Sequence, residues 1–287
     1  MLVTVQGSIR TRIARSWSLP TLVGVVVIVT YLLVALLAPW LAPFNESQIF
    51  DTPALPWGRP FLLGTDQLGR DILSRLIYGA RNTIGIALAA TCLSFVIGVT
   101  VGSILSLVGG WLDQVLSRFI DILMSIPSLI FSLVLLSMFG TGVTKLILLI
   151  AIVDAIYVIR ISRAISSNII AMEYVEVARL RGEGLLSIFF REILQNALPT
   201  LVVEAGLRFC FVFLTIASLS FLGVGVQPPT ADWGSMVREN ASLIGFADFD
   251  PWSALAALIP AFAIAILTIA VNIVVDGYVR HASDLNE

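Results

Sequence analysis

The sequence predicts an all-α integral membrane protein with six transmembrane helices, and two observations support this. Hydrophobic residues make up 58% of the 287 residues and charged residues only 13%, whereas soluble domains are close to half apolar and a quarter charged. The apolar residues are also gathered into uncharged runs of about 20 residues, the length that an α-helix needs to cross a bilayer. A water-soluble fold could not bury so much apolar surface, so lipid must be its solvent.

The first three spans follow from the N-terminal half of the chain. The apolar run at residues 20–43 is too long for the core of a signal peptide and has no obvious small-residue cleavage site after it, so we expect a retained anchor helix. Residues 83–112 contain no charge and predict the second span. The third is expected at residues 119–140, with Asp121 near its start. Pro127 should kink this helix, because proline removes a backbone hydrogen bond.

The remaining three spans are expected at residues 143–165, 198–226 and 252–277. The fourth is the one most interrupted by charge. Its charged residues are Lys145, Asp154 and Arg160. Ionisable groups inside a membrane are costly and are therefore candidates for function or for pairing between helices.

The arginines set the orientation, because Lys and Arg are enriched on the cytoplasmic side. Three of them precede the first span, which places the N-terminus in the cytoplasm, and six crossings return the C-terminus there. The arginine-rich loop after the fourth span also falls inside, whereas the segment after the first span falls outside in spite of its four arginines. The predicted segments are a cytoplasmic N-terminus (1–19), the anchor helix (20–43), an extracytoplasmic segment (44–82), a core transmembrane domain (83–277) that includes a cytoplasmic loop (166–198), and a cytoplasmic tail (278–287).

Sequence motifs for catalysis are absent. The chain contains no G-x-x-x-x-G-K-[ST] loop for phosphates, no G-x-S-x-G elbow, no H-E-x-x-H pair and no C-x-x-C motif. Its one histidine lies in the tail and both cysteines fall in apolar runs, so we expect neither catalytic residues nor a metal site. The net charge of −2 gives no reason to expect nucleic acid as a partner. A transporter, a channel or a membrane scaffold remains.

Residues 173–199 interrupt the apolar sequence with a charged, amphipathic segment, EYVEVARLRGEGLLSIFFREILQNALP. Gly182 and Gly184 flank Glu183 and predict a sharp helix–turn–helix. The apolar residues after the turn form a surface too broad to leave in water. One interpretation is an interfacial helix lying on the bilayer. The other is a helix inserted into a groove on a soluble partner, with the small residues Ala178 and Gly182 allowing close approach.

This segment resembles the EAA loop of ABC-transporter permeases of the dipeptide, oligopeptide and nickel importer family. The matching residues are Glu173, Tyr174, Val175, Glu176, Ala178, Gly182, Phe190, Arg191, Ile193, Leu194, Asn196 and Pro199. In that family the loop is the coupling helix that fits a groove on the ATPase subunit. The resemblance implies that the residues docking to the ATPase are Glu173, Glu176, Ala178, Gly182, Glu183, Leu185 and Arg191.

Four further blocks resemble the same family in the same order. They lie at residues 63–81, 109–130 and 220–237 and in the tail NIVVDGYVRHASD. The match is closest to the C-type permease of the peptide importers, which implies a type I ABC importer permease fold and a multi-pass subunit of the bacterial cytoplasmic (inner) membrane. It also implies a heterodimer with a homologous B-type permease, two cytoplasmic ABC ATPase subunits and an extracytoplasmic substrate-binding protein.

In such a machine the chain is non-catalytic and binds no cofactor, and ATP and Mg lie on the partner subunits. The implied cargo is di- or oligopeptides. Nickel chelates, glutathione, opines or oligosaccharides are alternative cargoes for the same machine. An ion-coupled secondary carrier, which needs intramembrane acids, is an alternative mechanism, and a purely structural membrane protein is a third class.

Two further sets of residues are candidate sites. Those for the translocation path or for intramembrane pairing are Asp154, Glu204, Arg208 and Asp121. Glu204 and Arg208 are spaced for a local i,i+4 pair, and Asp154 can either pair with an arginine of another helix or contact substrate. Candidates for docking the binding protein are Trp57, Trp233, Pro228 and Pro229. For the tryptophans the alternative is aromatic anchoring at the membrane interface.

Overall fold

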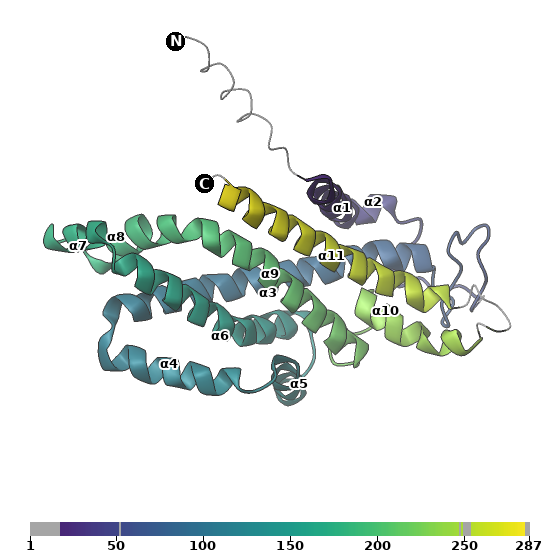
Figure 1. Cartoon of the computed structure of the whole chain (residues 1–287). Helices are drawn as coiled ribbons and strands as arrows, with labels where there is room; N and C mark the ends of the chain where they lie inside the picture. Colours follow the sequence, from purple (N-terminus) through teal and green to yellow (C-terminus); the bar gives the residue numbers. More distant parts are fainter. Residues whose placement is uncertain (1–17, 52, 247, 249–253, 285–287) are drawn as a thin grey trace, which may run out of the picture.

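The computed structural model describes residues 18–51, 53–246, 248 and 254–284, and the long helices of this part lie side by side (Figure 1). Apart from an isolated bridge between Thr65 and Asp71, the regular secondary structure of the described residues is helical. The predicted all-α class is therefore confirmed. By length and composition four of the described helices could cross a membrane, and a bent pair of shorter helices would add a fifth.

The N-terminal anchor is two helices, α1 (Leu19–Leu36) and the short α2 (Ala38–Leu41), where one helix was expected at residues 20–43. Pro39 lies in the first turn of α2, where its missing N–H is tolerated, and the chain breaks just before it. α1 packs along the last helix, α11 (Leu255–Asp284), through glycines on both helices that leave no room for a side chain.

The most extensive contact between two described helices is that of α3 (Ile72–Val108) with α6 (Val143–Ile170). Gly98 and Gly102 lie on the face of α3 that meets α6, and a Cβ atom at Gly98 would collide with Val158. Small residues spaced in this way allow two helix backbones to approach closely. The contact fixes α6, which carries Asp154, against the rest of the bundle.

α3 begins well before residues 83–112, where the second span was expected. Asp71 caps the helix, and its carboxylate accepts a hydrogen bond from the Ser74 N–H at 2.8 Å. The sequence pattern missed this first part because Arg75 interrupts the apolar run, although its side chain is buried and paired in the structure.

The expected third span at residues 119–140 is a bent pair and not a single kinked helix. α4 (Gly110–Met124) and α5 (Ser128–Phe139) meet at 90°. Pro127 directly precedes α5 and cannot donate the hydrogen bond that would continue α4. The helix therefore breaks where the sequence predicted only a kink.

Ion pairs hold α4 along α6. Both oxygens of Asp113 accept hydrogen bonds from Arg163, at 2.5 and 2.6 Å. Asp121 lies 3.9 Å from Arg160, and both of these side chains are half exposed or more. Asp121 thus pairs with Arg160 and is not part of the group formed by the other three candidates, Asp154, Glu204 and Arg208.

The predicted helix–turn–helix at residues 173–199 is present, at one end of the bundle (Figure 1). The helix after the turn is longer than expected, since it begins at Leu185 and not at residue 198. Pro199 therefore lies inside it and not at its start, and the preceding carbonyl of Gln195 loses its helical partner. The elements in order are α7 (Glu173–Leu180), α8 (Leu185–Ile188), a π-helical turn η1 (Phe189–Ile193) and α9 (Leu194–Phe221).

The opposite end of the bundle carries α10 (Trp233–Asn240), the 3₁₀ turn η2 (Ala241–Phe246) and the irregular segment between α2 and α3 (Figure 1). Trp233 is buried there. Its indole N–H donates to the Leu76 carbonyl at 2.9 Å, and its ring packs edge-on against Tyr31 and Phe213. The prediction that Trp233 docks a binding protein is therefore wrong, because a side chain that is 2% exposed has no surface to offer.

Candidate functional sites: a polar pocket and a helical knob

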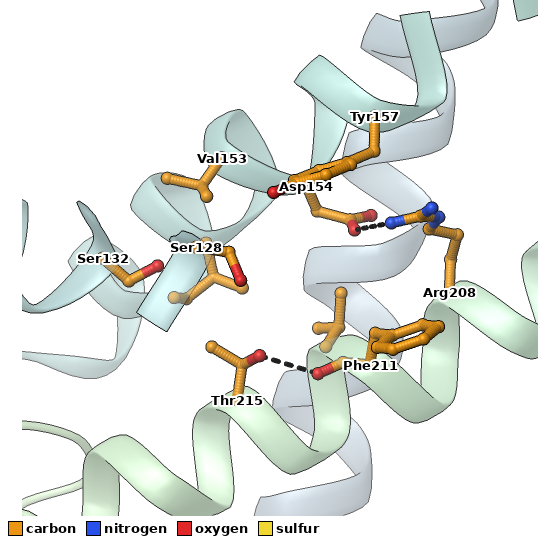
Figure 2. A pocket seen from close by; sticks show the side chains of 10 residues that line it. Ser128, Ser132, Val153, Asp154, Tyr157, Arg208, Phe211 and Thr215 are labelled. Carbon is orange, nitrogen blue, oxygen red and sulfur yellow. Dashed lines mark hydrogen bonds and ion pairs between the residues drawn. The ribbon is translucent and has the colours of Figure 1, made fainter. Parts of the chain in front are cut away.

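A polar pocket of about 240 Å³ lies between α5, α6 and α9 (Figure 2). Part of its lining consists of charged and hydroxyl-bearing side chains, which are costly inside a membrane and therefore mark sites of pairing or function. These polar lining residues are Ser128, Ser132, Asp154, Tyr157, Arg208 and Thr215, and Ile150, Val153, Phe211 and Val212 form the apolar rest of the wall.

Arg208 is the cation of this pocket, and it faces two carboxylates. Its Nε donates to Oε1 of Glu204 at 2.9 Å, which is the i,i+4 pair expected from the sequence. Its Nη1 lies 3.6 Å from Oδ1 of Asp154 on α6 (Figure 2). Asp154 thus has an arginine of another helix beside it, one of the two arrangements that the sequence left open.

The surroundings hold both charged groups in place. The Arg208 guanidinium lies over the rings of Tyr157 and Phe211, at 4.9 and 5.5 Å from their centroids, so it is also stabilised by cation–π contacts. Asp154 accepts a 2.7 Å hydrogen bond from the Ser94 hydroxyl on α3. Side chains from three helices therefore meet at one charged cluster.

The pocket wall formed by α5 is hydroxylic. Ser132 is completely buried, and its Oγ has no hydrogen-bond partner. Ser128 lies one turn earlier on the same helix and lines the same space (Figure 2). Thr215 on α9 already donates to the Phe211 carbonyl at 2.8 Å. A buried hydroxyl without a partner is costly, so Ser132 identifies a place where an occupant could supply the missing hydrogen bond.

The second candidate site is a knob formed by α7, the turn at residues 181–184 and α8. Gly182 has φ of +80°, which favours glycine, and its N–H donates to the Arg179 carbonyl at 2.9 Å. Glu183 connects the turn to α8. Its carboxylate pairs with Arg181 of the turn at 3.1 Å and accepts a hydrogen bond from the Ser187 hydroxyl of α8 at 2.9 Å. The knob is therefore a defined turn and not a loose loop.

The outer surface of the knob is apolar and is edged by charges of both signs. Its exposed large hydrophobic residues include Tyr174, Val177, Leu180, Leu185 and Leu186. Glu173, Glu176, Arg179 and Arg181 are exposed as well, and so is Arg191 in η1 just after the knob. A contiguous apolar surface beside polar groups is typical of a docking surface. Leu180 is 81% exposed, which makes it the most prominent apolar side chain of the knob.

Ala178 does not belong to this surface. It is fully buried within the chain, on the inner face of α7 together with Val175. The prediction that Ala178 contacts a partner directly is therefore corrected: its small side chain allows α7 to lie close to its own bundle. Gly182 differs, since nothing in the chain lies within 4 Å of the position that a Cβ atom would occupy there.

An ion-pair cluster fastens the opposite end of the bundle. Arg75 and Arg70 both contact Oε2 of Glu239 on α10, at 2.9 and 2.5 Å. The same two arginines lie 3.6 and 2.7 Å from Oδ2 of Asp66 in the segment before α3. Glu46 adds a second link, because its carboxylate accepts from the Ala231 N–H at 2.7 Å. The irregular segment is thereby fixed to α10.

Of the predicted binding-protein contacts, three remain at the surface of this end. Trp57 is 42% exposed, and Pro228 and Pro229 are exposed in the turn before α10. These positions are compatible with docking, which nothing in the structure tests.

Sequence reasoning did not single out the neutral lining residues of the pocket. Ser128 and Ser132 are spaced i,i+4 and follow Pro127, so they share one face of a helix in a charge-free run. That spacing is a usable signal. Tyr157 had none, because its role depends on Arg208 of a distant helix.

Three comparisons with known proteins bear on these sites. Residues 94–284 match the family described as "Binding-protein-dependent transport system inner membrane component". The di/tripeptide transport system permease protein DppC of Pseudomonas aeruginosa is 36% identical over 87% of this chain and 82% of its own length. The glutathione transport system permease protein GsiD of Pectobacterium atrosepticum is 31% identical over 88% of this chain and 82% of its own length.

A solved structure shares the fold. It is a chain of the MetNI methionine ABC transporter in inward-facing conformations, with a TM-score of 0.53 and 17% identity. The similarity covers 72% of this chain and 97% of the other.

Proposed function

The chain belongs to the family of binding-protein-dependent transport system inner membrane components, and on this premise we propose that it forms half of the translocation path of an ATP-driven peptide importer. It is a permease subunit, and the family supplies the transmembrane component of such transporters. The observation that carries the proposal is the knob, an exposed helix–turn–helix with an apolar surface at one end of the bundle. The sequence contains no nucleotide-binding motif of its own.

We assign six crossings to α1, α3, the bent pair α4–α5, α6, the continuous helix from α8 to α9, and α11. α6 completes this number although four charged side chains interrupt it, because three of them are paired with a charge of another helix. The pairs are Asp154 with Arg208, Arg160 with Asp121 and Arg163 with Asp113. The knob then lies in the cytoplasm, with the segments 1–19, 166–198 and 278–287, and the segment 44–82 lies outside. Residues 1–17 and 285–287 are outside the described part of the chain.

The partners follow from this arrangement. Two cytoplasmic ATPase subunits would hold ATP and Mg, and one of them would receive the knob through its apolar surface and through Glu173, Glu176, Glu183, Leu185 and Arg191. A homologous B-type permease would complete the path. A binding protein would deliver the cargo at the end that carries Trp57, Pro228 and Pro229. The membrane is the bacterial cytoplasmic (inner) membrane.

Di- and oligopeptides are the proposed cargo, since the dipeptide permeases are similar to this chain over most of their length. Glutathione is the first alternative, because a glutathione permease is nearly as similar. Nickel chelates, opines and oligosaccharides remain further alternatives. The ion-coupled carrier is less well supported, because its best acid, Asp154, is already held by Arg208 and Ser94.

Orientation is the first experimental test of this proposal, because a knob outside the cell could not reach an ATPase. A cysteine at Glu183 should react with a membrane-impermeant thiol reagent only from the cytoplasmic side, and a cysteine at Thr230 only from outside. Both substitutions belong in a background with Cys92 and Cys210 replaced by alanine. Reversed labelling would remove the docking argument.

A further inference from the structure

The charged cluster at the pocket carries an excess of negative charge. One guanidinium, Arg208, serves two carboxylates, and its shorter contact is to Glu204 at 2.9 Å. Asp154 is left with the longer contact of 3.6 Å at its Oδ1. Asp154 and Arg208 both line the pocket, whereas Glu204 does not. Because Arg208 lies closer to Glu204 than to Asp154, Asp154 is the less compensated of the two carboxylates, and it is the one that the open space reaches.

The open space has room for an end group but not for a large molecule. At about 30 Å³ for each water molecule, the 240 Å³ of the pocket corresponds to about eight water molecules, which is enough for the end group of a peptide. Hydroxyl groups stand opposite Asp154 on α5, and that of Ser132 is buried without a hydrogen-bond partner (Figure 2). A group that donates several hydrogen bonds and carries a positive charge would satisfy Asp154 and Ser132 together.

We propose that this pocket is a subsite for the N-terminal ammonium group of a peptide in transit. An ammonium carries three donors and one positive charge, which Asp154 Oδ1 and the hydroxyls of Ser128 and Ser132 complement. A peptide carboxylate does not fit, since it would lie beside Asp154 and would have to compete for Arg208, which Asp154 and Glu204 already contact. The proposal rests on the proposed function, because it needs peptides to pass between these helices.

The subsite can be tested by protection of a cysteine in the assembled importer. Ser128→Cys, in the background with Cys92 and Cys210 replaced by alanine, is treated with the small neutral reagent methyl methanethiosulfonate. The labelling rate is measured with increasing dialanine and with N-acetyl-dialanine, which lacks the ammonium. The matched control is Ser137→Cys on the exposed side of the same helix, outside the pocket.

We expect dialanine to slow labelling at residue 128 and N-acetyl-dialanine to leave it unchanged. Adding Asp154→Asn should raise the half-protecting dialanine concentration about tenfold, the value of one charge-assisted hydrogen bond. Labelling at residue 137 should respond to neither peptide. Gel filtration of the Asp154→Asn importer checks that the subunits stay together; if they separate, Ser132→Ala replaces it and should weaken protection in the same direction.

Equal protection by both peptides would overturn the ammonium subsite, and so would protection that ignores Asp154 and Ser132. An importer that takes up dialanine normally but shows no protection at residue 128 also overturns it, and leaves the proposed function standing. An unmodified importer that takes up no peptide with ATP contradicts the proposed function itself.

Discussion

Replacing Gly182 by valine is expected to abolish import while the permease still folds and inserts. Gly182 has φ of +80°, a conformation that costs an ordinary L-residue about 1–2 kcal/mol and a β-branched one more. Apart from the two neighbouring residues, no atom of the chain lies within 4 Å of the added Cβ, so the position is open at that atom. The strain falls on the turn, and the new side chain projects from the knob. ATPase subunits should therefore bind about tenfold more weakly or more, the equivalent of that strain.

Gly184→Val is the matched control for this prediction. Gly184 has φ of −71° and ψ of 158°, an extended conformation that valine adopts readily, and its Cβ position is equally open. Capture of the ATPase subunits by each purified permease pair, followed by uptake, separates the two variants. Full capture and normal uptake with Gly182→Val would leave the coupling assignment wrong and favour a helix that only lies on the membrane.

Arg75→Met is expected to lower the free energy of unfolding more than any other substitution proposed here. The Arg75 side chain is 1% exposed and lies between Glu239 at 2.9 Å and Asp66 at 3.6 Å. Methionine keeps much of the volume but removes the charge, which leaves Arg70 as the cation for both carboxylates. Breaking a buried ion pair in this way costs about 3–5 kcal/mol. The segment before α3 should also detach from α10.

Thermal unfolding of the detergent-purified protein measures this effect. The matched control is Arg59→Met, because Arg59 lies in the same segment but is exposed, and exposed substitutions usually change stability by less than about 0.5 kcal/mol. An unfolding temperature of Arg75→Met equal to that of Arg59→Met would show that the cluster does not hold this end of the bundle together.

The sequence predicted the spans best where apolar runs end cleanly. The sequence also predicted the helix–turn–helix around Gly182 and the local pair of Glu204 with Arg208, because each depends on residues close in the chain. The start of α3 was not, since Arg75 breaks the apolar pattern and only tertiary contacts compensate its charge. The break at Pro127 was underestimated, because the pattern shows a proline but not the direction of the next helix.

The candidate sites were harder to predict than the fold. Trp233 looked like an interfacial tryptophan, yet contacts with α1, α3 and α9 bury it. Ala178 looked available to a partner, yet its own bundle covers it. The pocket needed three helices to be placed at once before Asp154 could be assigned to Arg208 and to the hydroxyls of α5. Contacts between distant parts of the chain decide all three cases.

Peptide uptake into proteoliposomes tests most directly whether this chain couples ATP hydrolysis to transport. The vesicles contain this chain, its B-type partner and the two ATPases, with the loaded binding protein outside, in the compartment opposite the ATPase subunits, and ATP with Mg on the ATPase side. Uptake is predicted to require ATP and every subunit, to persist without any ion gradient and to disappear with Gly182→Val, while this chain alone hydrolyses no ATP. Uptake that follows an imposed proton or sodium gradient and proceeds without ATP would contradict the account.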